Sequence, residues 1–244
     1  NTILELIMSL SIIIPTYNEV KQLKYTVKKL RSLKKKINKY DLIFIDDFST
    51  DGSYQKIISF KKKDSKIKIY RNTKKGLGSA IKLGIKKSKK KYVCVFMCDL
   101  SDDVNDIYRY YRIMKDNKNL DAVFGTRFSK NSKVKNYPYF KLILNRVANN
   151  IIRLLFLSKY NDFTNAFKIY KKKCLIDLKP LISENFNIFL ELPLKTLIRK
   201  KKFKIISINW RNRKKGSSKF KVNELSSKYF FTLIYCFFEK ILLK

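Results

Sequence analysis

The chain has 244 residues, 45% of them hydrophobic, which is enough to form the core of one sizeable domain. Its 56 Lys and Arg outnumber 19 Asp and Glu, so the formal net charge of +37 favours an anionic partner, although an AT-rich genome that enriches Lys, Ile and Asn would explain the same excess. The absence of His excludes Ser-His-Asp and Cys-His catalysis and removes the commonest zinc ligand.

The first half of the chain alternates strand patterns with helix patterns. Apolar runs that end in polar residues predict strands at residues 10–19, 40–53, 66–72, 91–103 and 121–128. Apolar residues at helical spacing predict helices between them, at residues 19–36, 53–63, 75–88 and 105–117. This alternation predicts an α/β fold with a mostly parallel central sheet in a three-layer arrangement.

Four of the predicted strands run into polar clusters, at residues 15–19, 46–53, 99–103 and 125–127. Because the carboxyl ends of parallel strands share one edge of a sheet, these clusters should meet there and form a ligand site. The third cluster begins a run of four carboxylates, which are Asp99, Asp102, Asp103 and Asp106. Their mutual repulsion costs energy unless a cation lies among them, so the run predicts a cation site.

The second half of the chain is more apolar and ends in a hydrophobic tail. Residues 139–157 form an amphipathic pattern, residues 211–221 are basic and polar, and residues 229–238 are almost entirely apolar. None of these runs reaches the roughly 20 apolar residues that span a bilayer. We therefore expect one domain over residues 8–225 and a C-terminal amphipathic helix over residues 226–244 that contacts a membrane or a partner, or alternatively packs on the core.

Eight short motifs follow one another along the chain: IPTYNE, IDDFSTDGS, KGLGSA, CDLSDD, FGTRF, FTNAFK, FLELPLK and NRKKGSSK. In this order they resemble the inverting family 2 glycosyltransferases of the GT-A fold, and more narrowly the dolichyl-phosphate mannose synthase-like branch of polyprenyl-phosphate glycosyltransferases. The resemblance covers roughly residues 10–222. It implies an enzyme with a GT-A fold that moves a hexose from GDP-mannose or a UDP-hexose to dolichyl or undecaprenyl phosphate, with inversion.

The resemblance also implies where the protein acts and with which partners. A lipid acceptor places it at the cytoplasmic face of the membrane as a peripheral protein, with a separate membrane subunit as a further partner. Four Cys without a C-x-x-C pair fit a reducing compartment, and residues 1–14 lack the basic start and cleavage site of a signal peptide. A polyprenyl phosphate already carries an ionised oxygen, so the absence of a His base fits this acceptor.

Residue by residue, the resemblance places the nucleotide sugar against Pro15, Tyr17, Glu19, Asp46 or Asp47, Gly76, Asp99 and Arg127. Asp99 matches the last acid of an Asp-x-Asp motif that binds Mg²⁺ or Mn²⁺, with Ser101 and Asp103 as further metal ligands. Arg127 is implied near the diphosphate or the acceptor phosphate, and Arg213 and Lys219 in a basic loop that closes over the phosphates. These three cations and Asp99 are the implied catalytic residues.

Some of these assignments have alternatives. The first acid of the Asp-x-Asp motif is replaced by Met97, which is no ligand for Mg²⁺ or Mn²⁺, so Asp99 must share the metal with other side chains of its loop. Asp103 would serve equally well as the cap of the helix that follows. Gly76 opens a glycine-rich helix entry without a Rossmann or Walker fingerprint, so packing or a turn is an alternative to phosphate binding.

Two other functions stay open at this point. A family 2 glycosyltransferase with the same fold would act on a glycan or glycolipid acceptor in cell-envelope polysaccharide synthesis. A basic nucleic-acid-binding protein would fit the charge, but the sequence has no apparent RNA-binding motif. We expect a nucleotide sugar, a divalent metal, a lipid phosphate and a membrane surface as partners, and no nucleic acid.

Overall fold

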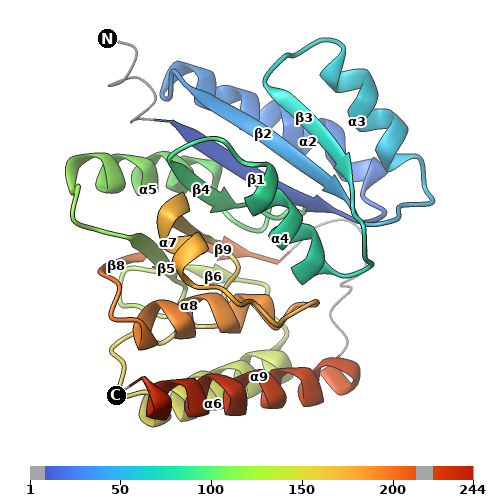
Figure 1. Cartoon of the computed structure of the whole chain (residues 1–244). Helices are drawn as coiled ribbons and strands as arrows, with labels where there is room; N and C mark the ends of the chain where they lie inside the picture. The colour runs from blue at the N-terminus through green and yellow to red at the C-terminus, as the bar shows by residue number, and fades with distance from the viewer. Residues whose placement is uncertain (1–8, 213–221, 244) are drawn as a thin grey trace.

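The computed structural model describes residues 9–212 and 222–243, and its centre is a seven-stranded sheet (Figure 1). The strands follow the order β3-β2-β1-β4-β7-β5-β8. Their bounds are β1 Leu10–Thr16, β2 Tyr40–Asp46, β3 Ile67–Arg71, β4 Tyr92–Val95, β5 Ala122–Thr126, β7 Lys168–Lys171 and β8 Phe203–Ser207. Neighbouring strands are parallel except at β7, which is antiparallel to both β4 and β5. The predicted α/β fold with a mostly parallel sheet is confirmed.

The central strands are buried because their side chains are apolar toward both faces of the sheet. All seven residues of β1 and all seven of β2 are buried. The two strands pair in parallel from Leu10 opposite Tyr40 to Thr16 opposite Asp46. A parallel strand covered on both faces requires such a continuous apolar run. Since both strands end together, the loops that follow them start at the same edge of the sheet.

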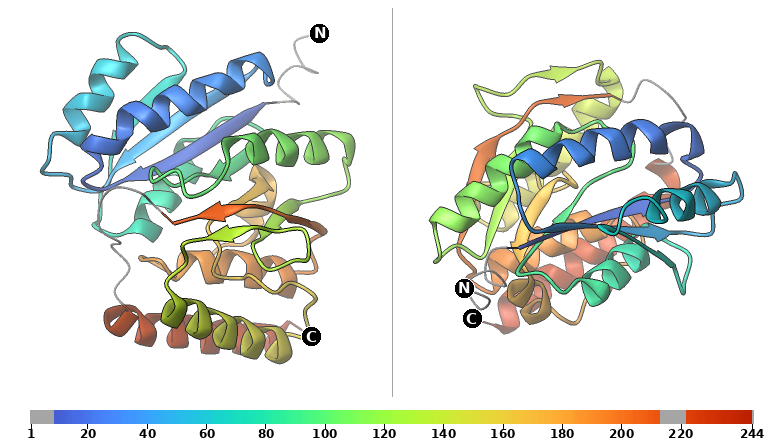
Figure 2. Two further views of the ribbon diagram at one scale, coloured as in Figure 1. Left: turned by 180° about the vertical axis from the view of Figure 1, so that it is seen from behind. Right: turned by 90° about the horizontal axis from the view of Figure 1, so that it is seen from above.

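Helices cover both faces of the sheet and so form the predicted three layers (Figure 2). One face packs against α2 Val20–Arg31, η1 Ser32–Lys35, α3 Ser53–Lys61 and α5 Val104–Asp116. The other face packs against α4 Leu77–Lys87, α7 Lys172–Asp177 and α8 Ile188–Ile198. The alternation of side chains along β1 separates the two cores, because Ile12 and Ile14 belong to the first and Ile13 to the second.

Two long helices, α6 Tyr139–Leu155 and α9 Val222–Leu242, lie at one end of the molecule (Figures 1 and 2). α9 packs on α8 through a 2.9 Å hydrogen bond from Asn187 Nδ2 to Thr232 Oγ1 and through ion pairs of Glu239 with basic side chains at the end of α8. The C-terminal helix expected from the sequence is therefore present, and one of its faces packs on the core. The domain boundary between residues 225 and 226 stays a prediction.

Strand β7 and a small second sheet did not follow from the sequence. β7 inserts between β4 and β5 and reverses the direction of the sheet at that place. In the second sheet, β6 Val134–Lys135 pairs in parallel with β9 Trp210–Arg211. Both features bring late segments of the chain next to the loops that follow β4 and β5.

Candidate active site

A pocket of about 700 Å³ opens where the central strands end. Its walls come from the loops after β1, β2, β4 and β5, from the segment before β7, from the start of α6 and from the second turn of α9. The predicted site residues that line it are Pro15, Tyr17, Glu19, Asp47, Gly76, Asp99, Ser101 and Arg127, and Met97 and Asp102 of the acidic loop line it as well. Asp46 and Asp103 do not line it, and Arg213 and Lys219 lie outside the described residues.

Asp47, and not Asp46, reaches the pocket at the end of β2. The Asp47 carboxylate accepts hydrogen bonds from the Gly76 N–H at 2.9 Å and from Asn72 Nδ2 at 2.8 Å. Asp46 is buried and accepts a hydrogen bond from the Ser49 N–H at 3.3 Å. Successive side chains of a strand point to opposite faces, so two adjacent acids cannot both face one pocket. Of the two candidates for binding the nucleotide base, the structure places Asp47 at the pocket.

Gly76 is required for close packing. Its φ of +138° lies in the region that favours glycine, and a Cβ built at this position would overlap the carbonyl group of Glu184. Gly78 is subject to the steric constraint alone, because a Cβ there would lie 2.6 Å from the Ser183 carbonyl oxygen. The structure therefore gives Gly76 a packing role, and phosphate binding by Gly76 stays a prediction.

The loop after β1 is held in place by the loop after β2. The Glu19 N–H donates a hydrogen bond to Ser53 Oγ at 2.9 Å, and the Val20 N–H donates to Asp51 Oδ2 at 3.0 Å. These bonds satisfy backbone donors at the start of α2 that the helix itself cannot satisfy. The last residues of the IDDFSTDGS motif thus keep Tyr17 and Glu19 at the pocket rather than contacting a ligand themselves.

The acidic run after β4 divides into different environments. Asp99 lines the pocket, and its carboxylate accepts the Ser101 N–H at 3.1 Å. Asp102 is 8% exposed, and its Oδ1 atom has no hydrogen-bond partner among the described residues. Burial, and after it the charge of Asp99, raise the pKa of Asp102 to about 8. The Asp103 carboxylate accepts the Asn105 N–H at 2.9 Å and is the N-cap of α5.

The environments of these acids decide which of them can contribute to a metal site. Asp103 lines a neighbouring polar pocket of about 490 Å³, and its carboxylate is used at the start of α5. Asp103 thus caps α5, which was the alternative to metal binding, and it does not line the main pocket. Asp102 lines both pockets. Across residues 9–212 and 222–243, no three Asp, Glu or Cys side chains gather closely enough to hold a metal by themselves.

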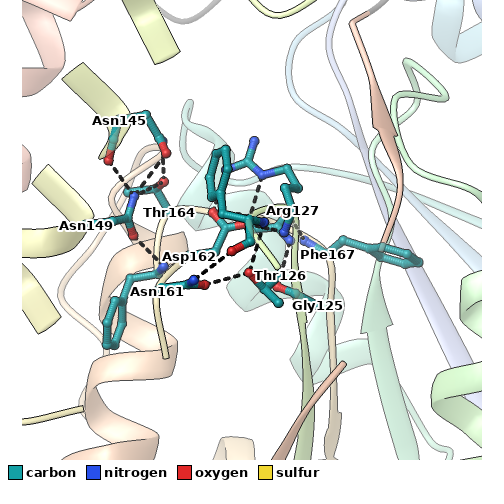
Figure 3. Close-up of polar contacts among 12 residues, drawn as sticks. Gly125, Thr126, Arg127, Asn145, Asn149, Asn161, Asp162, Thr164 and Phe167 are labelled. Atoms are coloured by element: carbon teal, nitrogen blue, oxygen red, sulfur yellow. Dashed lines mark hydrogen bonds and ion pairs between the residues drawn. The ribbon is translucent and has the colours of Figure 1, made fainter. Parts of the chain in front are cut away.

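Arg127 is bound by Asp162 in a buried ion pair (Figure 3). Its Nε and Nη2 donate to the two carboxylate oxygens at 2.9 and 2.7 Å, and its backbone N–H donates to Oδ2 at 2.9 Å. Burial by itself would lower the pKa of Arg127, but the charge and hydrogen bonds of Asp162 outweigh it and raise that pKa. Arg127 lines the pocket with its charge already compensated, and its role toward a phosphate stays a prediction.

The segment before β7 and the first residue of β7 carry two functional candidates to which the sequence had assigned no role. Asp162 is one, and Lys168 is the other. Lys168 is 2% exposed, and its Nζ donates hydrogen bonds to the backbone carbonyls of Phe163, at 3.1 Å, and of Asn165. Burial lowers the pKa of Lys168 to about 7. The only signal in the sequence was the FTNAFK motif, which indicates that the segment matters but not which atoms it holds.

The segment that ends in β9 is bound to the acidic loop. The Arg211 N–H donates to the Ser101 carbonyl at 3.0 Å, and Trp210 forms an isolated antiparallel bridge with Asp102. The Trp210 ring packs on Tyr137, with the ring centroids 4.8 Å apart. The geometry thus joins the acidic loop to the strand that precedes residues 213–221, where the predictions for Arg213 and Lys219 lie.

The match to known proteins agrees with this geometry. Residues 11–179, well over half of the chain, match the family model described as "Glycosyl transferase family 2". The chain belongs to glycosyl transferase family 2. The predicted family is confirmed, and this family 2 member is an enzyme of the glycosyltransferase class.

Relatives of this family 2 glycosyltransferase act on lipid phosphates, according to their names. It is 28% identical over 222 residues to a dolichol-phosphate mannosyltransferase of Pyrococcus furiosus. The aligned region covers 88% of this chain and 60% of that protein. It is 25% identical over 210 residues to an undecaprenyl-phosphate mannosyltransferase of Micrococcus luteus, which covers 85% of each chain. The chain therefore spans about 60% of the length of the Pyrococcus relative.

Solved structures share the fold. Glucosyl-3-phosphoglycerate synthase of Mycobacterium tuberculosis, in complex with Mn²⁺ and UDP-glucose, superposes with a TM-score of 0.75. The two chains are 14% identical, and the match covers 97% of this chain and 83% of the other. At this identity the likeness concerns the fold, and the predicted GT-A fold is confirmed.

Proposed function

We propose that this family 2 glycosyltransferase transfers a hexose, with mannose as the first candidate, from a nucleotide sugar to a polyprenyl phosphate with inversion. The observation that carries the proposal is the pocket itself. Loops from four strands bring Tyr17, Asp47, Asp99 and Arg127 to one cavity that is large enough for a nucleotide sugar. The names of the two relatives support the polyprenyl phosphate as the acceptor class.

A divalent metal, Mg²⁺ or Mn²⁺, fits the acidic loop. Both ions prefer oxygen ligands, and Asp99, Ser101 and Asp102 offer oxygens at the pocket. The Oδ1 atom of Asp102 is buried without a hydrogen-bond partner, which is costly unless a cation or a proton is present. We therefore propose Asp102 in place of Asp103 as the third donor. When bound, the metal supplies positive charge that offsets the diphosphate of the leaving group.

The residues of the chain bind and orient the substrates rather than remove a proton. A phosphate acceptor is already ionised near neutral pH, so no general base is needed. Tyr17, Glu19 and Asp47 form the end of the pocket that we assign to the nucleoside, where Lys75 Nζ lies 5.5 Å from the centre of the Tyr17 ring. Asp162 and Lys168 hold the wall that precedes β7 through buried bonds, which keeps the pocket preorganised.

The acceptor lipid requires a membrane, and α6 and α9 supply an apolar face. In the part of the chain that the structure describes, no helix is both long and apolar enough to cross a bilayer. Large apolar side chains of α6 and α9, and Leu157 just after α6, are nevertheless exposed: Tyr139 77%, Phe140 71%, Leu154 69%, Leu157 87%, Phe230 64%, Phe231 63%, Phe238 58% and Leu242 82%. We call these residues the apolar face.

The apolar face suits the interface of a membrane. The two helices lie at the same end of the molecule (Figure 2) and touch through the rings of Phe156 and Phe237, whose centroids are 6.3 Å apart. Exposed apolar side chains that gather on two helices indicate a membrane or a protein partner, and the net charge of +37 of the chain favours anionic lipid. We propose peripheral binding at the cytoplasmic face, with or without a separate membrane subunit.

Transfer of labelled hexose to a short-chain prenyl phosphate tests the function directly. The purified protein would be offered GDP-mannose and UDP-glucose with Mg²⁺ or Mn²⁺, and the lipid product would be extracted and counted. Asp99→Asn should abolish transfer, whereas Asp103→Asn, which changes a helix cap outside the pocket, should retain most of it. Transfer to a glycan or glycolipid and not to any prenyl phosphate would replace our acceptor class with the other one.

Sedimentation with vesicles tests the membrane proposal. The double variant Phe140→Glu and Phe231→Glu should lose most of its binding to phosphatidylglycerol vesicles, because charges on the apolar face oppose burial in the interface. Tyr25→Glu is the matched control, since Tyr25 is 51% exposed but lies on α2, on another side of the sheet. If both proteins sediment like the wild type, the apolar face is not the membrane anchor.

A further inference from the structure

The FLELPLK motif lies in α8, and its two charged side chains are buried away from the pocket. Glu191 and Lys195 are each 0% exposed, and neither lines the pocket. Lys195 Nζ lies 3.6 Å from Oε1 of Glu191 and 3.1 Å from Oε2 of Glu239 on α9. Burying charges costs free energy unless each of them is bound. The role of this motif is therefore to be sought in what its charges hold, and not in a direct contact with a ligand.

Both charges bind the backbone of residues 180–185, which we call the α7–α8 segment. The two carboxylate oxygens of Glu191 accept hydrogen bonds from the N–H groups of Ile182 and Ser183, each at 2.8 Å. Lys195 Nζ donates to the backbone carbonyl of the first residue of the segment. The segment is neither helix nor strand, so side chains of α8 bind backbone groups that regular structure would otherwise pair.

The other side of the α7–α8 segment packs on the beginning of α4. The Gly78 N–H donates a hydrogen bond to the Glu184 carbonyl at 2.9 Å. A Cβ at Gly76 would overlap the same carbonyl, so the two backbones are in direct contact. Lys82 Nζ binds the Glu184 carboxylate at 2.5 Å. The segment is therefore held between α8 and the first two turns of α4.

The beginning of α4 in turn fixes the end of the pocket that we assign to the nucleoside. The Gly76 N–H donates to both carboxylate oxygens of Asp47, at 2.9 and 3.1 Å. Asn185, the last residue of the α7–α8 segment, and Phe186, which follows it, line the pocket. A displacement of the segment would therefore move two lining residues and the backbone donor that orients Asp47.

We propose that Glu191 is a positioning residue for the nucleotide sugar, which it does not touch: it holds the α7–α8 segment in the place that completes the nucleoside end of the pocket. This inference rests on the proposed function. Without the carboxylate, the N–H groups of Ile182 and Ser183 would turn toward water, and the segment would leave the start of α4. The apparent affinity for the nucleotide then falls with the fraction of molecules in which the segment is in place.

Titration calorimetry with GDP and UDP, in the presence of Mn²⁺, tests the inference. Glu191→Gln keeps the size of the side chain, but one of its oxygens becomes an NH₂ group, which cannot accept a backbone N–H. We expect the Kd of the nucleotide that the wild type binds to rise about tenfold, since a buried donor is left unsatisfied. Thr196→Val is the matched control. Thr196 is also 0% exposed and on α8, but its hydroxyl donates to the Leu192 carbonyl of the same helix, so the Kd should not change.

A second variant approaches the same segment from α4. Lys82→Met removes the bond to Glu184, and because the Lys82 side chain is 26% exposed, this protein should fold. Its Kd should rise by a smaller factor than that of Glu191→Gln. Circular dichroism establishes that each variant is folded. A wild-type Kd in folded Glu191→Gln overturns the inference. If Glu191→Gln does not fold, Lys82→Met decides, and a wild-type Kd there overturns it as well.

Steady-state kinetics separate positioning from a general loss of order. In Glu191→Gln the KM for the nucleotide sugar should rise about tenfold, as the Kd does, while the KM for a soluble short-chain prenyl phosphate stays unchanged. An equal rise of both KM values would overturn the inference, because the whole pocket would then be disturbed. If the wild type binds a nucleotide and Glu191→Gln binds it equally well, the inference fails while the proposed function stands. If the wild type binds neither GDP nor UDP, both are overturned.

Discussion

Breaking the buried ion pair between Arg127 and Asp162 by removing one partner should destabilise this protein more than most single substitutions. Asp162 is 0% exposed and Arg127 8% exposed, and two side-chain hydrogen bonds and one backbone hydrogen bond join them. Asp162→Asn keeps the size of the side chain but replaces the charge and turns an NH₂ group toward the guanidinium donors. Removing one partner of a buried pair leaves an uncompensated charge, so we expect a loss of about 3–5 kcal/mol of unfolding free energy.

Urea unfolding followed by circular dichroism measures this loss. For a chain of this length, each kcal/mol shifts the melting temperature by about 2–4 °C. The melting temperature of Asp162→Asn should therefore lie about 6–20 °C below that of the wild type. The control is Asp177→Asn, which removes a partner of Lys201 at 2.6 Å, where the side chains are 33% and 25% exposed. That variant should lose at most about 1 kcal/mol, because water screens exposed pairs.

The comparison between the two variants can refute the reasoning. If Asp162→Asn and Asp177→Asn unfold at the same urea concentration, the guanidinium of Arg127 is not committed to Asp162. Arg127 would then be an available phosphate cation, as the family resemblance implies.

Further tests address other parts of the molecule. Burial lowers the pKa of Lys168 from 10.5 to about 7, so between these pH values the unfolded chain binds more protons than the folded one. From pH 7 to pH 9, the free energy of unfolding of the wild type, measured in urea, should therefore rise by about 2 kcal/mol relative to that of Lys168→Met. The same pH dependence in both proteins would contradict this. Gly76→Ala should cost about 2 kcal/mol by the same method, because φ is +138° and a methyl group would meet backbone; an unchanged midpoint would argue against that packing. Arg213→Ala and Lys219→Ala should each lower kcat about 10²-fold, whereas Lys35→Ala should not; equal rates for all three would remove the basic loop from the mechanism.

The layered fold was predictable because its signals are local. Each of the five strands predicted from apolar runs is present, and the helices at 20–31, 53–61, 77–87 and 104–116 follow them in order. β7 was missed because it is four residues long and begins with Lys168, a polar side chain that is buried only because carbonyl oxygens of its own segment surround it. No pattern of apolar residues marks such a strand.

The position of the candidate site could be predicted from the sequence, but not all of the side chains that line it. Motif order brought Tyr17, Asp47 and Asp99 to one pocket, since parallel strands end at one edge. Within each acidic pair, however, the sequence could not choose a member. Asp47 lines the pocket beside a buried Asp46, and Asp102 lines it beside Asp103, the cap of α5.

The sequence by itself determined the family, the fold class and the edge of the sheet where the pocket opens, because strand periodicity and motif order are properties of neighbouring residues. Tertiary structure decided which charges are available. Asp162 lies 35 residues from Arg127 in the chain, yet it neutralises the cation that the motif had marked for a phosphate. Lys141 and Lys228 both line the pocket, although they lie on two helices far apart in sequence. Whether a charge is paired depends on which distant segments fold beside it, and no local pattern records that.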